Sequence, residues 1–87
     1  MNPELMQLKG QLAVAREKCG KLELEISGLV AIIRRYLPAY YIDALSLEAD
    51  KAGESMERLK VIHAELKILR QLIAKIEADL REAGFHV

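Results

Sequence analysis

The sequence predicts an all-α protein: an antiparallel helical hairpin of two long helices that dimerises into a four-helix bundle or coiled coil. Two long segments repeat apolar residues at alternating steps of three and four, the a/d pattern of packed helices. A proline separates these segments. Hydrophobic residues make up 52% of the chain and charged residues 30%, with no tryptophan, which is typical of coiled coils.

We expect the first helix to span residues 3–36. Asn2 is a good N-cap, Pro3 suits the first helical position, and Glu4 places negative charge at the positive end of the helix dipole. Seam residues follow without a fault: Leu5, Leu8, Leu12, Ala15, Cys19, Leu22, Ile26, Leu29, Ile33 and Tyr36.

Pro38 ends this helix because proline lacks an amide N–H and disfavours the α conformation in the residue before it. We expect a short turn over residues 37–39, which folds a second helix over residues 40–83 back antiparallel. Its seam has two consecutive steps of three near its middle and contains Leu45, Ala49, Ala52, Met56, Leu59, Ile62, Leu66, Leu69, Ile73, Ile76, Leu80 and Ala83. Gly84 and Phe85 predict a Schellman cap at its end.

Gly53 leaves undecided whether the chain forms two helices or three, because a glycine can break a helix. The apolar seam keeps its phase through Gly53, and a glycine inside a helix costs only about 1 kcal/mol relative to alanine. We therefore favour one continuous second helix. The whole chain, residues 1–87, is then a single helical-hairpin domain.

Two features of the second helix predict a homodimer. Apolar residues beside its seam form a second row, and a wide apolar face implies two neighbouring helices. With so short a turn, the second helix would also extend beyond the first and leave its apolar end uncovered. The expected interface contains Val61, Ile68, Leu72, Ile73, Ile76, Leu80 and Phe85. The pattern does not decide between a parallel and an antiparallel dimer.

A second candidate site for nucleic acid or a partner protein lies around the turn, at Arg34, Arg35, Tyr36, Tyr40 and Tyr41. Arginines contact phosphates, and tyrosines stack on bases or anchor protein interfaces. The architecture would be analogous to the Rop-type RNA-binding hairpin dimer, without a shared sequence motif. Against this role, 13 basic and 13 acidic residues cancel, so no strong field attracts a polyanion. The tyrosines would then simply close the end of the bundle.

No motif predicts catalysis, a metal site or a cofactor. Cys19 occupies a seam position, where a free cysteine acts as a small buried hydrophobe. His63 and His86 stand in no zinc or di-iron spacing, and no glycine-rich phosphate loop occurs. The sequence therefore predicts a non-catalytic protein that works through interactions.

The sequence also predicts a cytoplasmic protein without a membrane span. The first residues lack the basic and apolar parts of a signal peptide, and a lone cysteine forms no intramolecular disulfide. The longest apolar stretch, residues 26–33, is far shorter than the ~20 residues that cross a bilayer. Three functions stay open: a self-associating module with a helical protein partner, a hairpin dimer that binds RNA or DNA, and a small chaperone or adaptor.

Overall fold

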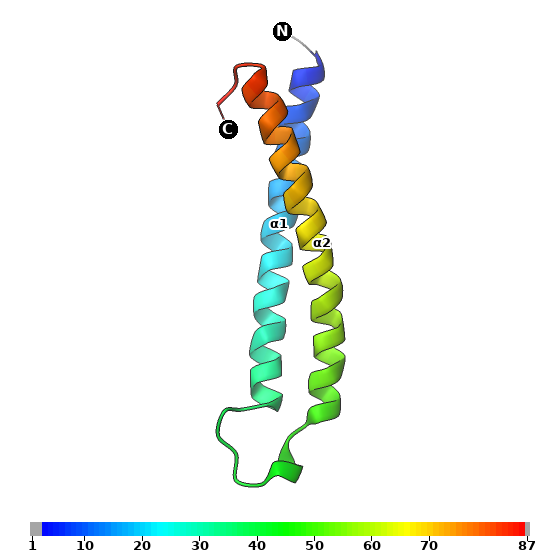
Figure 1. Ribbon diagram of the computed structural model, residues 1–87, viewed down its shortest axis with the longest axis vertical. Coiled ribbons are helices and arrows are strands. Elements are labelled where there is room, and N and C mark those ends of the chain that lie inside the picture. Colours follow the sequence, from blue (N-terminus) through cyan, green and yellow to red (C-terminus); the bar gives the residue numbers. More distant parts are fainter. Residues whose placement is uncertain (1–2, 87) are drawn as a thin grey trace.

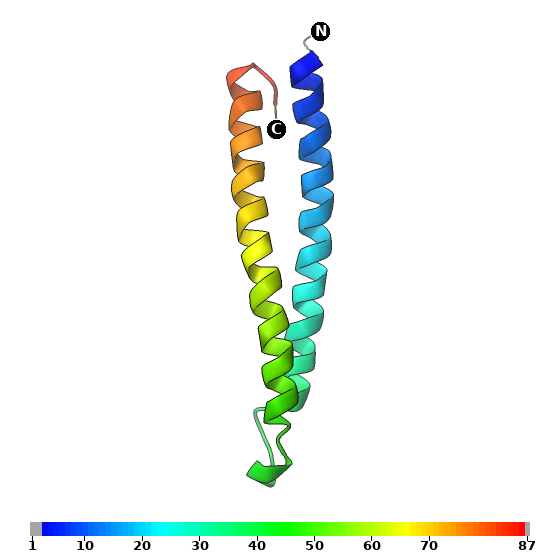
Figure 2. The same ribbon diagram turned by 90° about the vertical axis from the view of Figure 1, so that its right-hand side faces the viewer.

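The computed structural model describes residues 3–86, which form a helical hairpin (Figure 1). Helix α1 spans Pro3–Tyr36, the 3₁₀ helix η1 spans Ala44–Ser46, and helix α2 spans Ala49–Glu82. The two long helices run antiparallel, with both described ends of the chain at one end of the rod and the connection at the other (Figures 1 and 2). Residues 3–86 contain no strand. The predicted hairpin is confirmed.

The molecule is a thin rod of 65 × 18 × 15 Å. Its radius of gyration is 19.0 Å, whereas a compact chain of this length has about 12 Å. A helix with its side chains is about 10–12 Å wide, so the rod is only one helical layer thick. Each helix therefore has a single neighbour, as the two perpendicular views show (Figures 1 and 2).

Helix α1 has the predicted bounds. Its first turn carries Glu4 and its last turn carries Arg34 and Arg35, so charges of the favourable sign lie at both ends of the helix dipole. The last hydrogen bond at this end runs from the Leu37 N–H to the Ile33 carbonyl, at 2.8 Å. The predicted N-cap, Asn2, lies outside the described residues.

The predicted turn over residues 37–39 and the predicted helix start at residue 40 are wrong. The connection extends to residue 48, and α2 begins at Ala49. Asp43 explains the difference, because its carboxylate accepts the Leu45 N–H at 3.1 Å and caps η1. The Ser46 hydroxyl donates to the Asp43 carbonyl at 2.6 Å. Aspartate and serine satisfy their neighbours' backbone groups in this way and so compete with the α-helix.

The longer connection changes which parts of the two helices lie side by side. Each has 34 residues, and the Glu48 N–H donates to the Tyr36 carbonyl at 3.4 Å, which joins the end of α1 to the start of α2. The expected uncovered end of α2 is therefore absent. Ile76 and Leu80 are instead buried inside the hairpin, 3% and 0% exposed.

The core consists of two buried clusters along the seam. The first joins Leu12, Ile76 and Leu80, with four partly buried neighbours packed against it: Leu5, Leu8, Ile73 and Phe85. The second joins Leu22, Ile62 and Leu66, against which Cys19, Ile26, Leu29 and Leu69 pack. Both clusters consist of predicted seam residues, apart from Phe85 of the cap. Nearer the connection Ala52 is still buried, but the larger side chains of the seam are only partly covered, and Met56 is 39% exposed.

Helix α2 passes through Gly53 without a break. At its other end, the Phe85 N–H donates to the Leu80 carbonyl and the Gly84 N–H donates to the Arg81 carbonyl, both at 2.9 Å. Gly84 has a φ of 91°. These two bonds and the left-handed glycine define a Schellman motif, as the sequence predicts. The ammonium group of Lys9 lies 3.9 Å from the centre of the Phe85 ring, so the cap also contacts α1.

Candidate interaction surfaces

One broad side of the hairpin carries a row of exposed apolar side chains, here called the apolar face and defined by Val14, Val61, Ile68 and Leu72. These side chains are 67%, 51%, 67% and 48% exposed, respectively. Val14 comes from α1, and the other three lie beside the seam of α2 at helical spacing. The predicted second row of α2 is therefore on the surface.

A shallow groove of about 770 Å³ runs between the helices on this side, lined by Gln7, Gly10, Gln11, Val14, Ala15, Lys18, Leu69 and Leu72. A second groove of about 270 Å³ shares three of these residues and adds Leu22, Glu65 and Ile68. The two grooves form one continuous apolar furrow with Lys18 and Glu65 among its polar residues.

The other residues of the predicted interface have a different position. Ile76 and Leu80 are buried, and Ile73 and Phe85 are partly buried against them. All four cover α1 of their own chain, because the helices match along their whole length. The structure thus brings Val61, Ile68 and Leu72 together on the surface and places the remaining four in the hairpin core.

The opposite side carries ion pairs between the helices and is here called the ionic face, defined by Arg16, Glu23, Arg70 and Glu77. Arg16 lies 3.8 Å from Glu77, and Arg70 pairs with Glu23. The Cys19 thiol also donates to the Glu23 carboxylate, at 3.6 Å. The pKa of Glu23 is lowered, first by the Arg70 guanidinium and then by this thiol. Glu23 in turn raises the pKa of Arg70.

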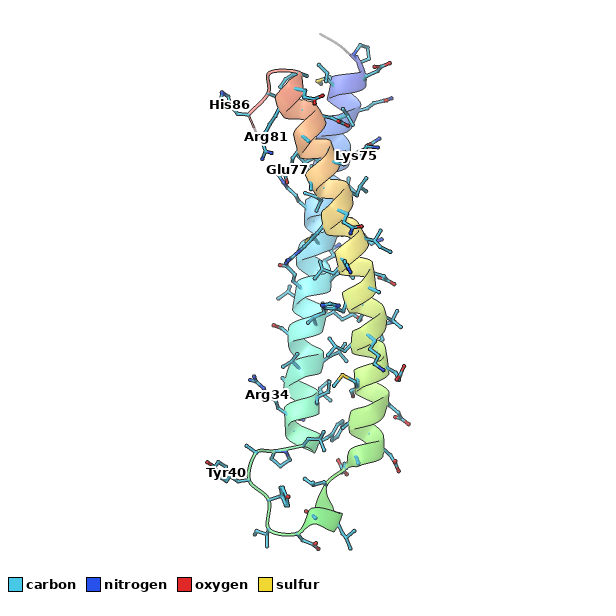
Figure 3. The ribbon with its side chains drawn as sticks, viewed as in Figure 1. Arg34, Tyr40, Lys75, Glu77, Arg81 and His86 are labelled. Atoms are coloured by element: carbon cyan, nitrogen blue, oxygen red, sulfur yellow. The ribbon has the colours of Figure 1, made fainter. Side chains whose placement is uncertain are left out.

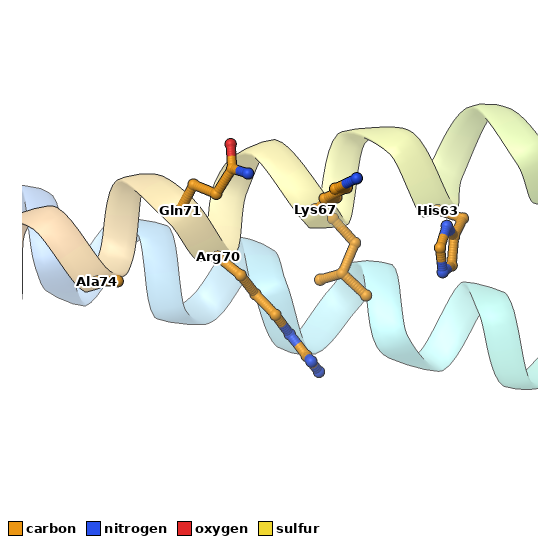
Figure 4. Close-up of a pocket in the computed structure, with 6 residues that line it drawn as sticks. His63, Lys67, Arg70, Gln71 and Ala74 are labelled. Carbon is orange, nitrogen blue, oxygen red and sulfur yellow. The ribbon is translucent and has the colours of Figure 1, made fainter.

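The groups on the ionic face do not converge on a binding site. A groove of about 400 Å³ is lined by His63, Leu66, Lys67, Arg70, Gln71 and Ala74. Figure 4 shows that Arg70 extends toward α1, where it meets Glu23, whereas Lys67 and Gln71 point away from it. Figure 3 shows Glu77 and Arg81 on one side of α2 and Lys75 on the other. Arg70 and Glu77 therefore bridge the two helices instead of facing each other around a pocket.

The predicted patch of arginines and tyrosines lies at the connection end of the rod. Arg34 and Arg35 are exposed, Tyr36 is partly buried at the seam, and Tyr40 and Tyr41 are 94% and 56% exposed. Adjacent helical residues point about 100° apart, so the two arginines diverge. Arg34 and Tyr40 project on the same side of the rod (Figure 3).

Sequence reasoning missed three apolar surface residues. Leu45 was expected in the seam, but it lies in η1 and is 93% exposed. Ile42, next to it in the connection, is fully exposed. No other residue at a step of seven from Val14 in α1 is aliphatic, so the periodicity of the sequence does not mark Val14 as part of an apolar surface. Only the match between the helices shows that it shares a groove with Leu72.

The described residues contain no group of three or more histidine, cysteine, aspartate or glutamate side chains that could hold a metal ion. None of the described helices is long and apolar enough to cross a membrane. No family model matches this chain, and no curated protein or solved structure matches it significantly.

Proposed function

We propose that this protein is a non-catalytic assembly module whose hairpin self-associates through the apolar face into a four-helix bundle. The observation that carries this proposal is the exposed area of the single hairpin, 6802 Å². A compact monomer of 9.8 kDa exposes roughly 5,200 Å². The excess of about 1,600 Å² is about twice what each partner buries in a standard interface.

The position of the exposed apolar residues supports the same proposal. Two ion pairs link the helices on the ionic face, at Arg16–Glu77 and Glu23–Arg70. On the other side an ion pair joins Arg58 to Glu25, at 3.0 Å, toward the connection. The remainder of that side is the apolar furrow. A second hairpin placed there would cover the seam from outside and turn one helical layer into two. A cytoplasmic location, where a lone thiol stays reduced, fits this role.

The mass of the native protein, measured by size-exclusion chromatography with light scattering, tests this proposal. We expect twice the 9.8 kDa of one chain at micromolar concentration. The variant Ile68→Glu with Leu72→Glu should be monomeric, because it places charge in the furrow. Leu24→Glu is the matched control, since Leu24 is 74% exposed outside the apolar face and its replacement should leave the dimer intact. A native protein that stays monomeric would rule the proposal out.

A second candidate function is binding of single-stranded RNA or DNA at the connection. It is favoured by the nearly complete exposure of Tyr40 and by Arg34 on the same side of the rod (Figure 3). A fluorescence anisotropy titration with a labelled single strand at low salt tests it, because phosphate contacts weaken as salt rises. Arg34→Ala with Arg35→Ala should then reduce the affinity. Absence of binding by the native protein at low salt removes this candidate.

A further inference from the structure

The polar residues of the apolar furrow are arranged in complementary pairs across the two helices. Lys18 of α1 and Glu65 of α2 line the same groove. One heptad nearer the connection, Glu25 of α1 forms its ion pair with Arg58 of α2. At each of these two heights along the rod, one helix carries a positive charge and the other a negative one.

Apolar residues are also paired across the two helices, toward the end of the rod that lies away from the connection. Val14 of α1 and Leu72 of α2 line one groove, with Ile68 in the groove beside it. This side of the hairpin therefore carries three levels: Val14 with Leu72, where Gln11 also lines the groove, then positive with negative, and negative with positive. At these two charged levels the sign changes along each helix, and it is opposite between the two helices.

A second copy of this chain can cover this face with two-fold symmetry in two ways. If the axis runs along the rod, both connections lie at the same end, and α1 of one copy faces α2 of the other at the same height. If the axis runs across the rod, the connections lie at opposite ends. Each helix then faces its own counterpart, with heights reversed about the axis.

The first arrangement makes every level complementary. Val14 meets the partner's Leu72, Lys18 meets the partner's Glu65, and Glu25 meets the partner's Arg58. This follows from symmetry, because the contact across the interface joins the same two levels that match within one hairpin. Opposite charges facing each other across an interface favour that alignment and disfavour others.

The second arrangement loses this match. Suppose that the two-fold axis passes midway between Val61 and Leu72, so that this apolar row faces the same row of the partner. Arg58 then comes opposite the partner's Lys75, and like charges face each other. Val14 then lies against the partner's α1. The residues at steps of seven around Val14 in that helix are Gln7, Lys21 and Gly28, so the apolar contact is lost.

We infer that two copies of this chain associate through the apolar face with both connections at the same end of the bundle. This inference rests on the proposed self-association and adds its orientation. In the single hairpin the connection lies at one end of the rod and both described ends of the chain at the other (Figure 1). The bundle then has one end that carries both exposed connections and another that carries the described ends of both chains.

Electron–electron distance measurements between spin labels test the orientation. Asp50 at the start of α2 is exposed, so Asp50→Cys in a Cys19→Ala background accepts one label per chain. With the connections at the same end, the labels should lie within about 30 Å, because neighbouring helix axes are about 8–10 Å apart. With the connections at opposite ends, the separation would be about 50 Å at ~1.5 Å per residue. The longer distance overturns the inference.

Charge reversal provides a second test that needs no label. Lys18→Glu and Glu65→Lys should each raise the dimer dissociation constant by about 10-fold, since each places like charges at two symmetric contacts. The double variant should recover native affinity, and failure of the double variant to recover contradicts the orientation. Light scattering on the native protein separates the two proposals: a monomer rejects self-association itself, whereas a dimer with the long distance rejects only the orientation.

Discussion

Leu80 and Leu24 are the same residue type in opposite environments. Leu80 is 0% exposed and Leu24 is 74% exposed. Leu80→Ala should lower the free energy of unfolding by about 2–5 kcal/mol, because it leaves a cavity in the cluster with Leu12 and Ile76. Leu24→Ala should change it by less than about 0.5 kcal/mol. Urea denaturation followed by circular dichroism, at one fixed protein concentration, measures both, and equal losses would contradict the burial of Leu80.

Glu23 gives the hairpin a small dependence on pH. Its pKa in the folded protein lies below the ordinary value of 4.5, because of Arg70 first and Cys19 second. The folded state thus favours the ionised carboxylate. The stabilisation is complete above the ordinary pKa and is lost as the pH falls through the lowered one.

Glu23→Gln should therefore reduce the Tm more near pH 7 than near pH 3. The effect should shrink in high salt, because the Glu23–Arg70 pair is exposed to solvent. Glu17→Gln is the control, since the ion pair of Glu17 is with Lys21 of its own helix and does not join α1 to α2. If the loss of Tm were the same at both pH values, the carboxylate of Glu23 would not carry this dependence.

Residue positions were predictable where they follow a regular seam. Leu12, Leu22, Ile62 and Leu66 are buried as their spacing predicts. Val14 could not be predicted as part of a surface, because its place opposite Leu72 depends on how far α2 slides along α1. That offset is determined by the connection and not by either helix alone.

At the level of helices, two glycines of α2 and its cap should respond oppositely to alanine. Gly53 lies in the helix, and a Cβ there would meet no atom within 4 Å. Gly53→Ala should therefore stabilise the protein by up to about 1 kcal/mol. Gly84 has a φ of 91°, which an alanine adopts only with strain, so Gly84→Ala should destabilise by about 1–2 kcal/mol. Thermal denaturation of both variants measures the difference, and a stabilised Gly84→Ala would contradict the Schellman cap.

The bounds of α1 were predictable because Pro3 and Pro38 mark its two ends. The start of α2 was not, because the apolar spacing extends back to Leu45 and conceals the local bonds of Asp43. The wrong start of α2 shifted the predicted alignment of α2 along α1. It produced the expected uncovered end around Ile76 and Leu80, which the structure instead buries.

For the whole molecule, self-association should make stability depend on protein concentration. Only the folded hairpin presents the apolar face, so mass action stabilises the dimer as concentration rises. The Tm of the native protein should increase between about 1 µM and about 100 µM. The Ile68→Glu, Leu72→Glu variant should show no such increase, while Leu24→Glu should behave as the native protein. A native Tm that is constant over this range would contradict a reversible dimer.

The antiparallel hairpin also has a mechanical consequence, because both described ends of the chain lie at the same end of the rod (Figure 2). A force that separates residues 3 and 86 opens the hairpin like a zipper. It loads the cluster of Leu12, Ile76 and Leu80 first and the cluster of Leu22, Ile62 and Leu66 afterwards. A single-molecule pulling trace should therefore show two successive low-force extensions.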